Sequence, residues 1–149
     1  MDGMLEPALR LAAAVLFGGL IGLNRDLYGK PTGLRTHALV ALGAALAVMS
    51  STEFGLIQSS ADAVSRVIQG VMGGIGFLGA GVILRAADGE RIVHTATAAS
   101  IWVTAALGIV CGIGAWRIAA LAAIGVTLIL VLGSIVDHAL YGRLKDRDS

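Results

Sequence analysis

The chain has 149 residues, of which 56% are hydrophobic and only 14% are charged, and its mean hydropathy is +0.84. In soluble domains roughly a quarter of the residues are charged, so this composition argues against a water-soluble fold. The net charge of +1 says little about partners, because in a membrane protein the distribution of charge matters more than its sum.

Five apolar runs follow one another along the chain, and we expect each to cross a membrane as a helix. A helix needs about 20 residues, and no fewer than about 17, to cross a hydrocarbon core of ~30 Å. The second run is the weakest, since its strictly apolar part covers only residues 38–49. The expected spans are residues 8–23, 36–52, 67–84, 95–111 and 118–136. The sequence therefore predicts an all-α, polytopic transmembrane bundle in a single domain over residues 1–149.

The basic residues predict the orientation of this bundle. With the N-terminus outside and the C-terminus in the cytoplasm, only Arg10, Arg66 and Arg117 are external. The cytoplasmic set is Arg25, Lys30, Arg35, Arg85, Arg91, Arg143, Lys145 and Arg147. This bias fits the rule that Lys and Arg gather on the cytoplasmic side. If the second run did not span, Arg85 and Arg91 would move to the other side and much of the bias would vanish.

The first cytoplasmic loop carries the strongest indication of a site. Pro31 and Gly33 predict a turn. Arg35, Thr36 and His37 then fall on the opening turn of the second helix, where the helix dipole and the free amide groups favour an anion.

Two interpretations of this loop stay open. In the first, the basic residues are topology anchors that contact lipid phosphate. In the second, Arg35, with Arg25 and Asn24, binds a partner carboxylate, a phosphate or the cytoplasmic end of the third helix.

The third apolar run is unusually rich in glycine. Its glycines are Gly70, Gly73, Gly74, Gly76, Gly79 and Gly81. Gly70 and Gly74 have GxxxG spacing, which predicts a helix-packing face; the pairs Gly18/Gly22 and Gly108/Gly112 have the same spacing. Alternatively, the glycines interrupt the helix where a substrate or ion passes. A dinucleotide fingerprint at residues 74–79 is rejected, because no strand or following acidic residue supports it. Gln69, which directly precedes Gly70, needs a hydrogen-bond partner within the apolar run.

The fourth run places small and hydroxyl residues at three- and four-residue steps, and these share one helix face. They are Thr97, Ser100, Thr104, Gly108 and Cys111. Such a face is typical of helix-to-helix contact, with a conduction path as the alternative.

No carboxylate falls in the middle of an apolar run, and His and Cys have no metal-ligand spacing. Divalent cations bound without their water prefer carboxylate ligands, and intramembrane proton relays use ionisable groups. A nucleophile with an adjacent base is also missing. We therefore expect no metal site, no catalytic residue and no cofactor, and the chain is not predicted to be an enzyme.

Four blocks together resemble the membrane domain of the MgtC/SapB family. They are GGLIGLNRD at 18–26, GLRTHALVALGAAL at 33–46, IQGVMGGIGFLGAGVILR at 68–85 and TAASIWVTAALGIVCGIG at 97–114. The resemblance implies a bacterial inner-membrane protein of about five helices, associated with survival in low magnesium, acid or a host cell. It further implies action by binding and modulating other membrane proteins, not by carrying Mg²⁺.

Three departures from the family pattern matter. Before the fourth helix, the family's Gly-Leu-Thr-Thr-Ala-Ala reads His94-Thr-Ala-Thr-Ala-Ala99 here, which affects the match at Thr95 but not at Thr97. The family's Glu-Arg pair at the end of the first helix is Asn24-Arg25 here, which leaves Asp26 as the candidate to replace that carboxylate. The cytoplasmic C-terminal domain of the longer members is not expected, so the resemblance is nearer to the short SapB-like members.

Two functions follow as expectations. The first is a homodimer, formed through the glycine-rich face, that regulates another membrane protein under magnesium or acid stress. The second is a small transporter or channel for an ion or solute, using the face of Thr97, Ser100 and Thr104. The expected partners are the lipid bilayer, a second copy and another membrane protein, with no nucleic acid.

Overall fold

The structure, a computed structural model, describes residues 2–53, 61–84 and 95–145. Within these residues the chain forms five α-helices, preceded by one turn of 3-10 helix, η1 (Asp2–Met4). The α-helices are α1 (Leu5–Leu27), α2 (Leu34–Glu53), α3 (Ala61–Leu84), α4 (Thr95–Ile113) and α5 (Trp116–Lys145). The all-helical prediction is therefore confirmed.

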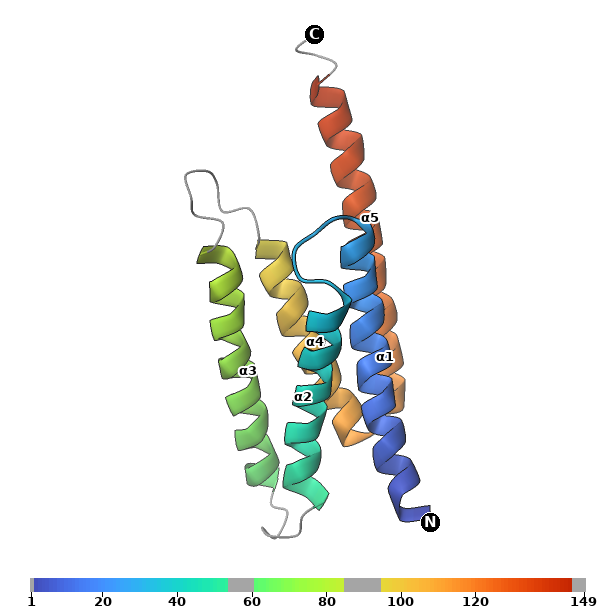
Figure 1. Ribbon diagram of the computed structural model, residues 1–149, viewed down its shortest axis with the longest axis vertical. Coiled ribbons are helices and arrows are strands. Elements are labelled where there is room, and N and C mark those ends of the chain that lie inside the picture. Colours follow the sequence, from blue (N-terminus) through green and yellow to red (C-terminus); the bar gives the residue numbers. More distant parts are fainter. Residues whose placement is uncertain (1, 54–60, 85–94, 146–149) are drawn as a thin grey trace.

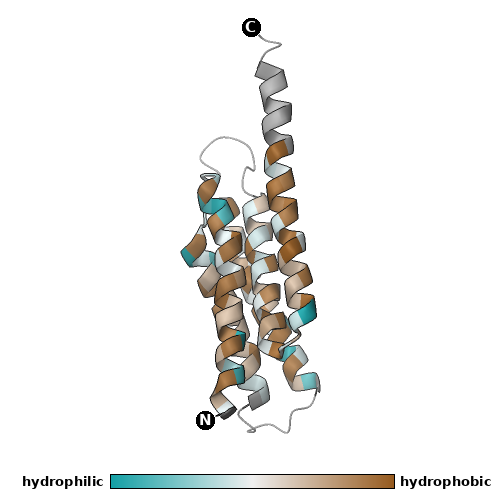
Figure 2. Cartoon of the chain, turned by 90° about the vertical axis from the view of Figure 1, so that its right-hand side faces the viewer, coloured by the Kyte–Doolittle hydropathy of each residue, from teal (hydrophilic) through white to brown (hydrophobic). Residues whose placement is uncertain are grey.

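Consecutive helices run in opposite directions, so the two termini lie at opposite ends of the bundle (Figure 1). Each of the five helices is long and apolar enough to cross a membrane. Hydrophobic residues cover most of the helix surfaces, and hydrophilic residues lie mainly towards the two ends (Figure 2). This is the distribution that a lipid environment requires, because backbone groups are satisfied inside helices and apolar side chains face hydrocarbon.

The helices are longer than the predicted spans. The largest differences are at the start of α3, at Ala61 instead of residue 67, and at the end of α5, at Lys145 instead of residue 136. Backbone hydrogen bonding continues through polar residues on either side of the apolar run, so hydropathy alone makes the helices too short. The orientation across the membrane stays a prediction, and three of the basic residues used for it, Arg85, Arg91 and Arg147, lie outside the described residues.

The core of the bundle forms around α4, which packs against each of the other four helices. Its buried side alternates small and branched residues, among them Ala105 and Leu107, and it meets Ala41 and Ala45 of α2. By contrast, α3 stands at one side of the bundle (Figure 1), and most of its described residues are exposed or half-buried. The tightest packing therefore involves α1, α2 and α4.

Two glycine pairs allow α2 to lie close to both neighbours. A β-carbon on Gly18 of α1 would stand 2.7 Å from the Ala41 β-carbon and 2.7 Å from the His37 carbonyl oxygen. On the other side of α2, a β-carbon on Gly108 of α4 would overlap the backbone of Ala41. Gly22 and Gly112 repeat these contacts one turn away. Glycine is required here because backbones approach more closely than any side chain permits.

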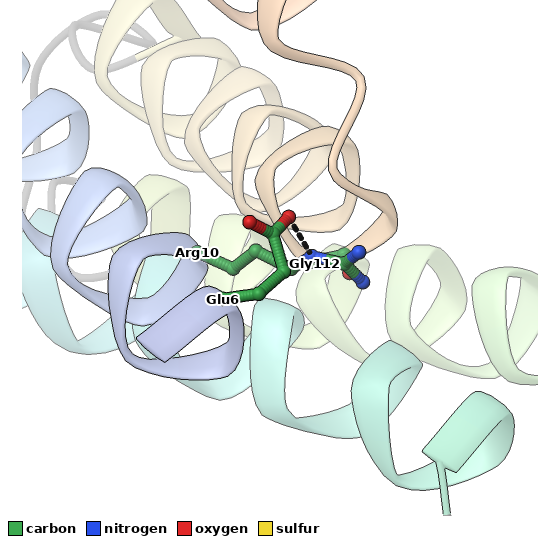
Figure 3. A network of polar contacts seen from close by, with 3 residues as sticks. All are labelled: Glu6, Arg10 and Gly112. Atoms are coloured by element: carbon green, nitrogen blue, oxygen red, sulfur yellow. Dashed lines mark hydrogen bonds and ion pairs between the residues drawn. The ribbon is translucent and has the colours of Figure 1, made fainter. Parts of the chain in front are cut away.

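At the end of the bundle that holds the N-terminus, Arg10 joins α1 to the turn between α4 and α5 (Figure 3). Its Nη1 donates to the carbonyl oxygen of Gly112 at 3.1 Å, and its Nε pairs with the Glu6 carboxylate at 3.0 Å. The carbonyl groups at a helix C-terminus lack intrahelical partners and carry partial negative charge. Arg10 therefore stabilises the end of α4.

Candidate polar site at the end of helix α1

Arg25 is the most deeply buried arginine that the structure describes, with only 5% of its surface exposed. It continues the packing stripe of α1, whose buried members are Ala14, Gly18, Ile21, Gly22 and Arg25. Because residues three and four apart share one helix face, the stripe that packs α1 against its neighbours also turns Arg25 inward. The guanidinium Nη2 donates a hydrogen bond to the Thr97 hydroxyl at the start of α4.

The same guanidinium is incompletely paired. Its Nε is buried and has no hydrogen-bond partner among the described residues. Within that part of the chain the ion pair formed is Arg10 with Glu6, at the opposite end of the bundle. A guanidinium has five N–H donors, and burying a charge without a counter-charge is costly. Arg25 is therefore an inward-facing cation whose hydrogen-bonding capacity is only partly used.

His37 is the second buried polar group, with 0% of its surface exposed. Its Nδ1 lies 3.1 Å from the Gly33 carbonyl oxygen, and its Nε2 lies 3.2 Å from the Ser100 hydroxyl of α4. The two ring nitrogens thus contact a backbone oxygen just before α2 and a hydroxyl of α4. His37 therefore joins α2 to α4.

The hydroxyl face of α4 is buried, as its spacing predicts. The Ser100 hydroxyl lies 2.8 Å from the Thr97 carbonyl oxygen, and the Thr104 hydroxyl donates to the Ser100 carbonyl oxygen at 2.8 Å. These bonds satisfy the hydroxyls within α4, while Arg25 and His37 attach to the same face from α1 and α2. The arrangement fits contact between helices, the first of the two interpretations given to this face.

Asp26 caps the start of α2. Its Oδ2 accepts a hydrogen bond from the backbone N–H of Leu34 at 2.9 Å. Gly33 leaves the space that the Asp26 carboxylate occupies, because a β-carbon at position 33 would overlap that carboxylate. The sequence predicts that the start of this helix favours an anion, and that anion is the chain's own Asp26.

A cavity of about 560 Å³ lies beside Arg25, between α1, the turn after it, α4 and α5. Its polar walls include Asn24, Arg25, Lys30 and Thr97, and α5 supplies Ser134. The remaining lining residues are Tyr28, Gly29, Pro31, Ala96, Ile129, Leu130 and Gly133. Among its described lining residues, the cavity has two basic side chains and no carboxylate, so this part of its wall is positively charged.

The structure brings together most of the predicted loop and α4 residues, but not all. Asn24, Arg25 and Thr97 meet at the cavity, whereas Arg35 is exposed and Thr36 half-buried, and neither lines it. α2 begins one residue before Arg35, and its packing face takes His37, so a role for the exposed Arg35 in binding a partner stays a prediction. Gln69 is exposed on α3 and donates to Ser65 at 3.2 Å, away from this site.

Sequence reasoning missed three contributors. Lys30 and Ser134 line the cavity from the α1–α2 turn and from α5. The role of Arg10 was also missed. A signal for Lys30 existed, since it stands in the same loop as Arg25 and adjoins Pro31. Ser134 could not have been found without knowing that α5 lies beside α1.

The glycines of α3 do not make a tight packing face within the chain. A β-carbon on Gly70, Gly73, Gly74, Gly76 or Gly81 would meet nothing within 4 Å among the described residues, and one on Gly79 would make ordinary contact with Ala98 at 3.5 Å. The prediction of close packing holds inside the chain for Gly18, Gly22, Gly108 and Gly112 instead. Contact between the α3 glycines and a second chain stays a prediction.

Comparison with known proteins gives the family. The model of the MgtC family matches residues 11–139. The chain is 47% identical over 119 residues to Protein SrpB of Synechococcus elongatus, covering 74% of this chain and 65% of that protein. It is 40% identical over 133 residues to Protein MgtC of Salmonella typhimurium, covering 89% of this chain and 53% of that protein.

A third relative is named "Putative magnesium transporter YhiD", from Escherichia coli, with 39% identity over 148 residues, 96% of this chain and 66% of that protein. The chain thus spans between 53% and 66% of the length of these curated relatives. No solved structure matches it. On the strength of the family match over residues 11–139 and of these identities, the chain is a membrane protein that belongs to the MgtC family.

Proposed function

We propose that this protein acts in a bacterial inner membrane by binding another membrane protein and modulating it under magnesium or acid stress. Its action is then one of binding and not of catalysis. Family membership supports the link to magnesium, since one relative carries that metal in its name. The observation that carries the binding function is the outward face of α3.

This face is an apolar groove between α2 and α3, with a volume of about 390 Å³. Its lining comprises Leu39, Val40, Gly43, Ala44, Gly70, Val71, Gly74, Ile75 and Leu78. Three of these residues are glycines whose missing side chains leave space, since no described residue lies within 4 Å of a β-carbon at Gly43, Gly70 or Gly74. The lining includes the small residues that helix-to-helix contacts in membranes use.

The energetics favour a second helix over lipid at this groove. Glycine in a helix interior costs about 1 kcal/mol relative to alanine in aqueous hosts. Gly18 and Gly108 offset that cost through close contact with α2, whereas Gly70 and Gly74 make no such contact among the described residues. A partner helix seated against them would supply the missing van der Waals contact, since lipid chains fit a narrow groove less well.

A path for Mg²⁺ through the polar site is disfavoured by its charge. Arg25 and Lys30 both line the cavity. A divalent cation prefers carboxylate and carbonyl oxygens and is repelled by two nearby cations. Transport of Mg²⁺ through this cavity is therefore the weaker of the two candidate functions.

Affinity purification from native membranes in a mild detergent tests the proposal. Tagged wild-type protein should recover a defined membrane protein, and Gly74→Leu, which fills the groove, should reduce recovery at least about tenfold. Gly125→Leu on α5 is the matched control, because a β-carbon there also meets nothing within 4 Å, and it should leave recovery unchanged.

Three outcomes would contradict the proposal. One is equal recovery with wild type and Gly74→Leu. Another is recovery of only a second copy of this chain, which would assign the groove to a homodimer. The third is Mg²⁺ flux into liposomes that contain the purified protein and nothing else, which would favour the transporter.

A further inference from the structure

We propose that the cavity beside Arg25 is a binding site for a phosphate group, and that the phosphate belongs to an anionic phospholipid of the membrane. This site lies at the end of α1, on other helices than the groove of α2 and α3, and does not depend on the proposed partner.

The charge of the site calls for an anion. Only 5% of the Arg25 surface is exposed. Its Nε is buried and has no hydrogen-bond partner among the described residues, while its Nη2 donates to the Thr97 hydroxyl. Asp26, the carboxylate next in sequence, forms no ion pair with Arg25 among the described residues and accepts a hydrogen bond from the Leu34 N–H. An anion in the cavity would supply a counter-charge to Arg25 and Lys30.

The number of donors favours a phosphate over a single carboxylate. Lys30 adds a second positive charge, and Asn24 and Tyr28 add an amide and a hydroxyl to the lining, whereas the Ser134 hydroxyl already donates to the Val131 carbonyl oxygen. A phosphate group has several acceptor oxygens, so it can engage a guanidinium, an ammonium and a hydroxyl at once. The volume of about 560 Å³ also exceeds what a bare phosphate needs, and leaves room for the groups attached to it.

The surroundings point to a lipid as the source of the phosphate. One wall of the cavity is the outer side of α5, where Ile129 is 72% exposed in a segment that spans the membrane. One turn deeper, α1 and α5 form an apolar groove of about 350 Å³. It is lined by Phe17, Leu20, Ala120, Ala123, Ile124, Thr127 and Leu128.

These two spaces share helices and follow each other along the bundle. Leu20 of the groove precedes Asn24 of the cavity by one turn of α1, and Thr127 precedes Leu130 by about one turn of α5. A phosphate held by Arg25 therefore has an apolar track beside it, in the direction of the hydrocarbon core. This is the shape of a phospholipid, with its headgroup at a helix end and its acyl chain along the helices.

Native mass spectrometry of the delipidated protein tests the site. The probes are phosphatidylglycerol, glycerol phosphate and inorganic phosphate. Phosphatidylglycerol should bind the wild type, and Lys30→Met should weaken it about fivefold to tenfold through loss of one charge-assisted contact. Arg25→Met should weaken it further. Arg35→Met is the matched control, since this exposed arginine at the same end does not line the cavity, and it should leave binding unchanged.

Each result supports or overturns the phosphate site or its lipid source. Binding of phosphatidylglycerol well above that of the two soluble probes supports the lipid site. Equal binding of glycerol phosphate, lost in Lys30→Met, overturns the lipid as source while retaining a phosphate site. Equal binding of phosphatidylglycerol by wild type, Lys30→Met and Arg35→Met overturns the site altogether. If Arg25→Met yields no folded protein, Lys30→Met carries the decision, because Lys30 is exposed in a turn.

Discussion

Two groups of glycines with the same spacing behave differently in this protein. Gly18 and Gly22 on α1, and Gly108 and Gly112 on α4, bring those helices against the backbone of α2. Gly70 and Gly74 on α3 have the same GxxxG spacing, yet no described side chain or backbone approaches them within 4 Å. Spacing predicts which residues share a face, but it does not say whether the same chain or another covers that face.

The difference separates two roles for one motif. In the first group, glycine determines the distance between helices of the fold, so a larger residue must push backbones apart. In the second group, glycine determines the shape of an outer surface, so a larger residue changes only what binds there. Substitutions that add the same atoms to both groups test this separation.

The largest effect is expected for Gly108→Val. Its β-carbon would lie 2.8 Å from the Ala41 Cα and would overlap the neighbouring carbonyl, and backbone cannot move aside as a side chain can. We expect a loss of about 3 kcal/mol in the free energy of unfolding. Unfolding in mixed micelles followed by circular dichroism measures it. Gly74→Val is the control, and a loss as large as that of Gly108→Val would refute the distinction.

A smaller loss is expected for Gly18→Ala, which adds one methyl group between α1 and α2. The added carbon would stand 2.7 Å from the Ala41 β-carbon and from the His37 carbonyl oxygen, so the helices must shift slightly. We expect a destabilisation of about 2 kcal/mol in the same unfolding assay. Gly19→Ala on the same helix has nothing within 4 Å and should be neutral. Equal behaviour of the two variants would show that α1 and α2 are not held at this distance.

Gly33→Ala lies between the two groups, because its new β-carbon would meet a side chain instead of backbone. The Asp26 carboxylate would have to swing away and lose its hydrogen bond to the Leu34 N–H. We expect a loss of about 1 kcal/mol, the usual value of an N-terminal helix cap. The double variant with Asp26→Ala gives the check: once the carboxylate is gone, Gly33→Ala should cost almost nothing further. Additive losses would show that the two residues act independently.

The smallest effect on the fold is expected for Gly74→Ala. With no atom near its β-carbon, the substitution should leave the free energy of unfolding unchanged or raise it by up to about 1 kcal/mol, through the better helix propensity of alanine. The same variant should weaken recovery of a membrane partner. Clear destabilisation of the purified protein would mean that Gly74 packs within the chain after all.

Much of the fold could be predicted from the sequence. The five helices, their order and their membrane-spanning character follow from apolar runs of sufficient length. The buried face of Thr97, Ser100 and Thr104 follows from helical spacing. Helix ends could not be placed, because polar residues such as Asn24 and Asp26 continue α1 beyond the apolar run.

The site was predicted only in part, and Arg25 and Arg35 show why. Both are basic residues near the same turn, and local pattern gives no reason to prefer one. Arg25 is buried because it continues the stripe that packs α1 into the core, whereas Arg35 stands on the outer side of α2. Which side is inward depends on how α1, α2 and α4 assemble, so this choice required tertiary structure.

The central claim is that the groove of α2 and α3 receives a helix of another membrane protein, and photo-crosslinking in living cells tests it most directly. A photoreactive residue replaces Leu78, which lines the groove and is 48% exposed, or Leu128, which lies on α5 and is 53% exposed. We predict a defined protein adduct, other than a dimer of this chain, from position 78 and none from position 128. No protein adduct at position 78, or the same adduct from both positions, would contradict the account.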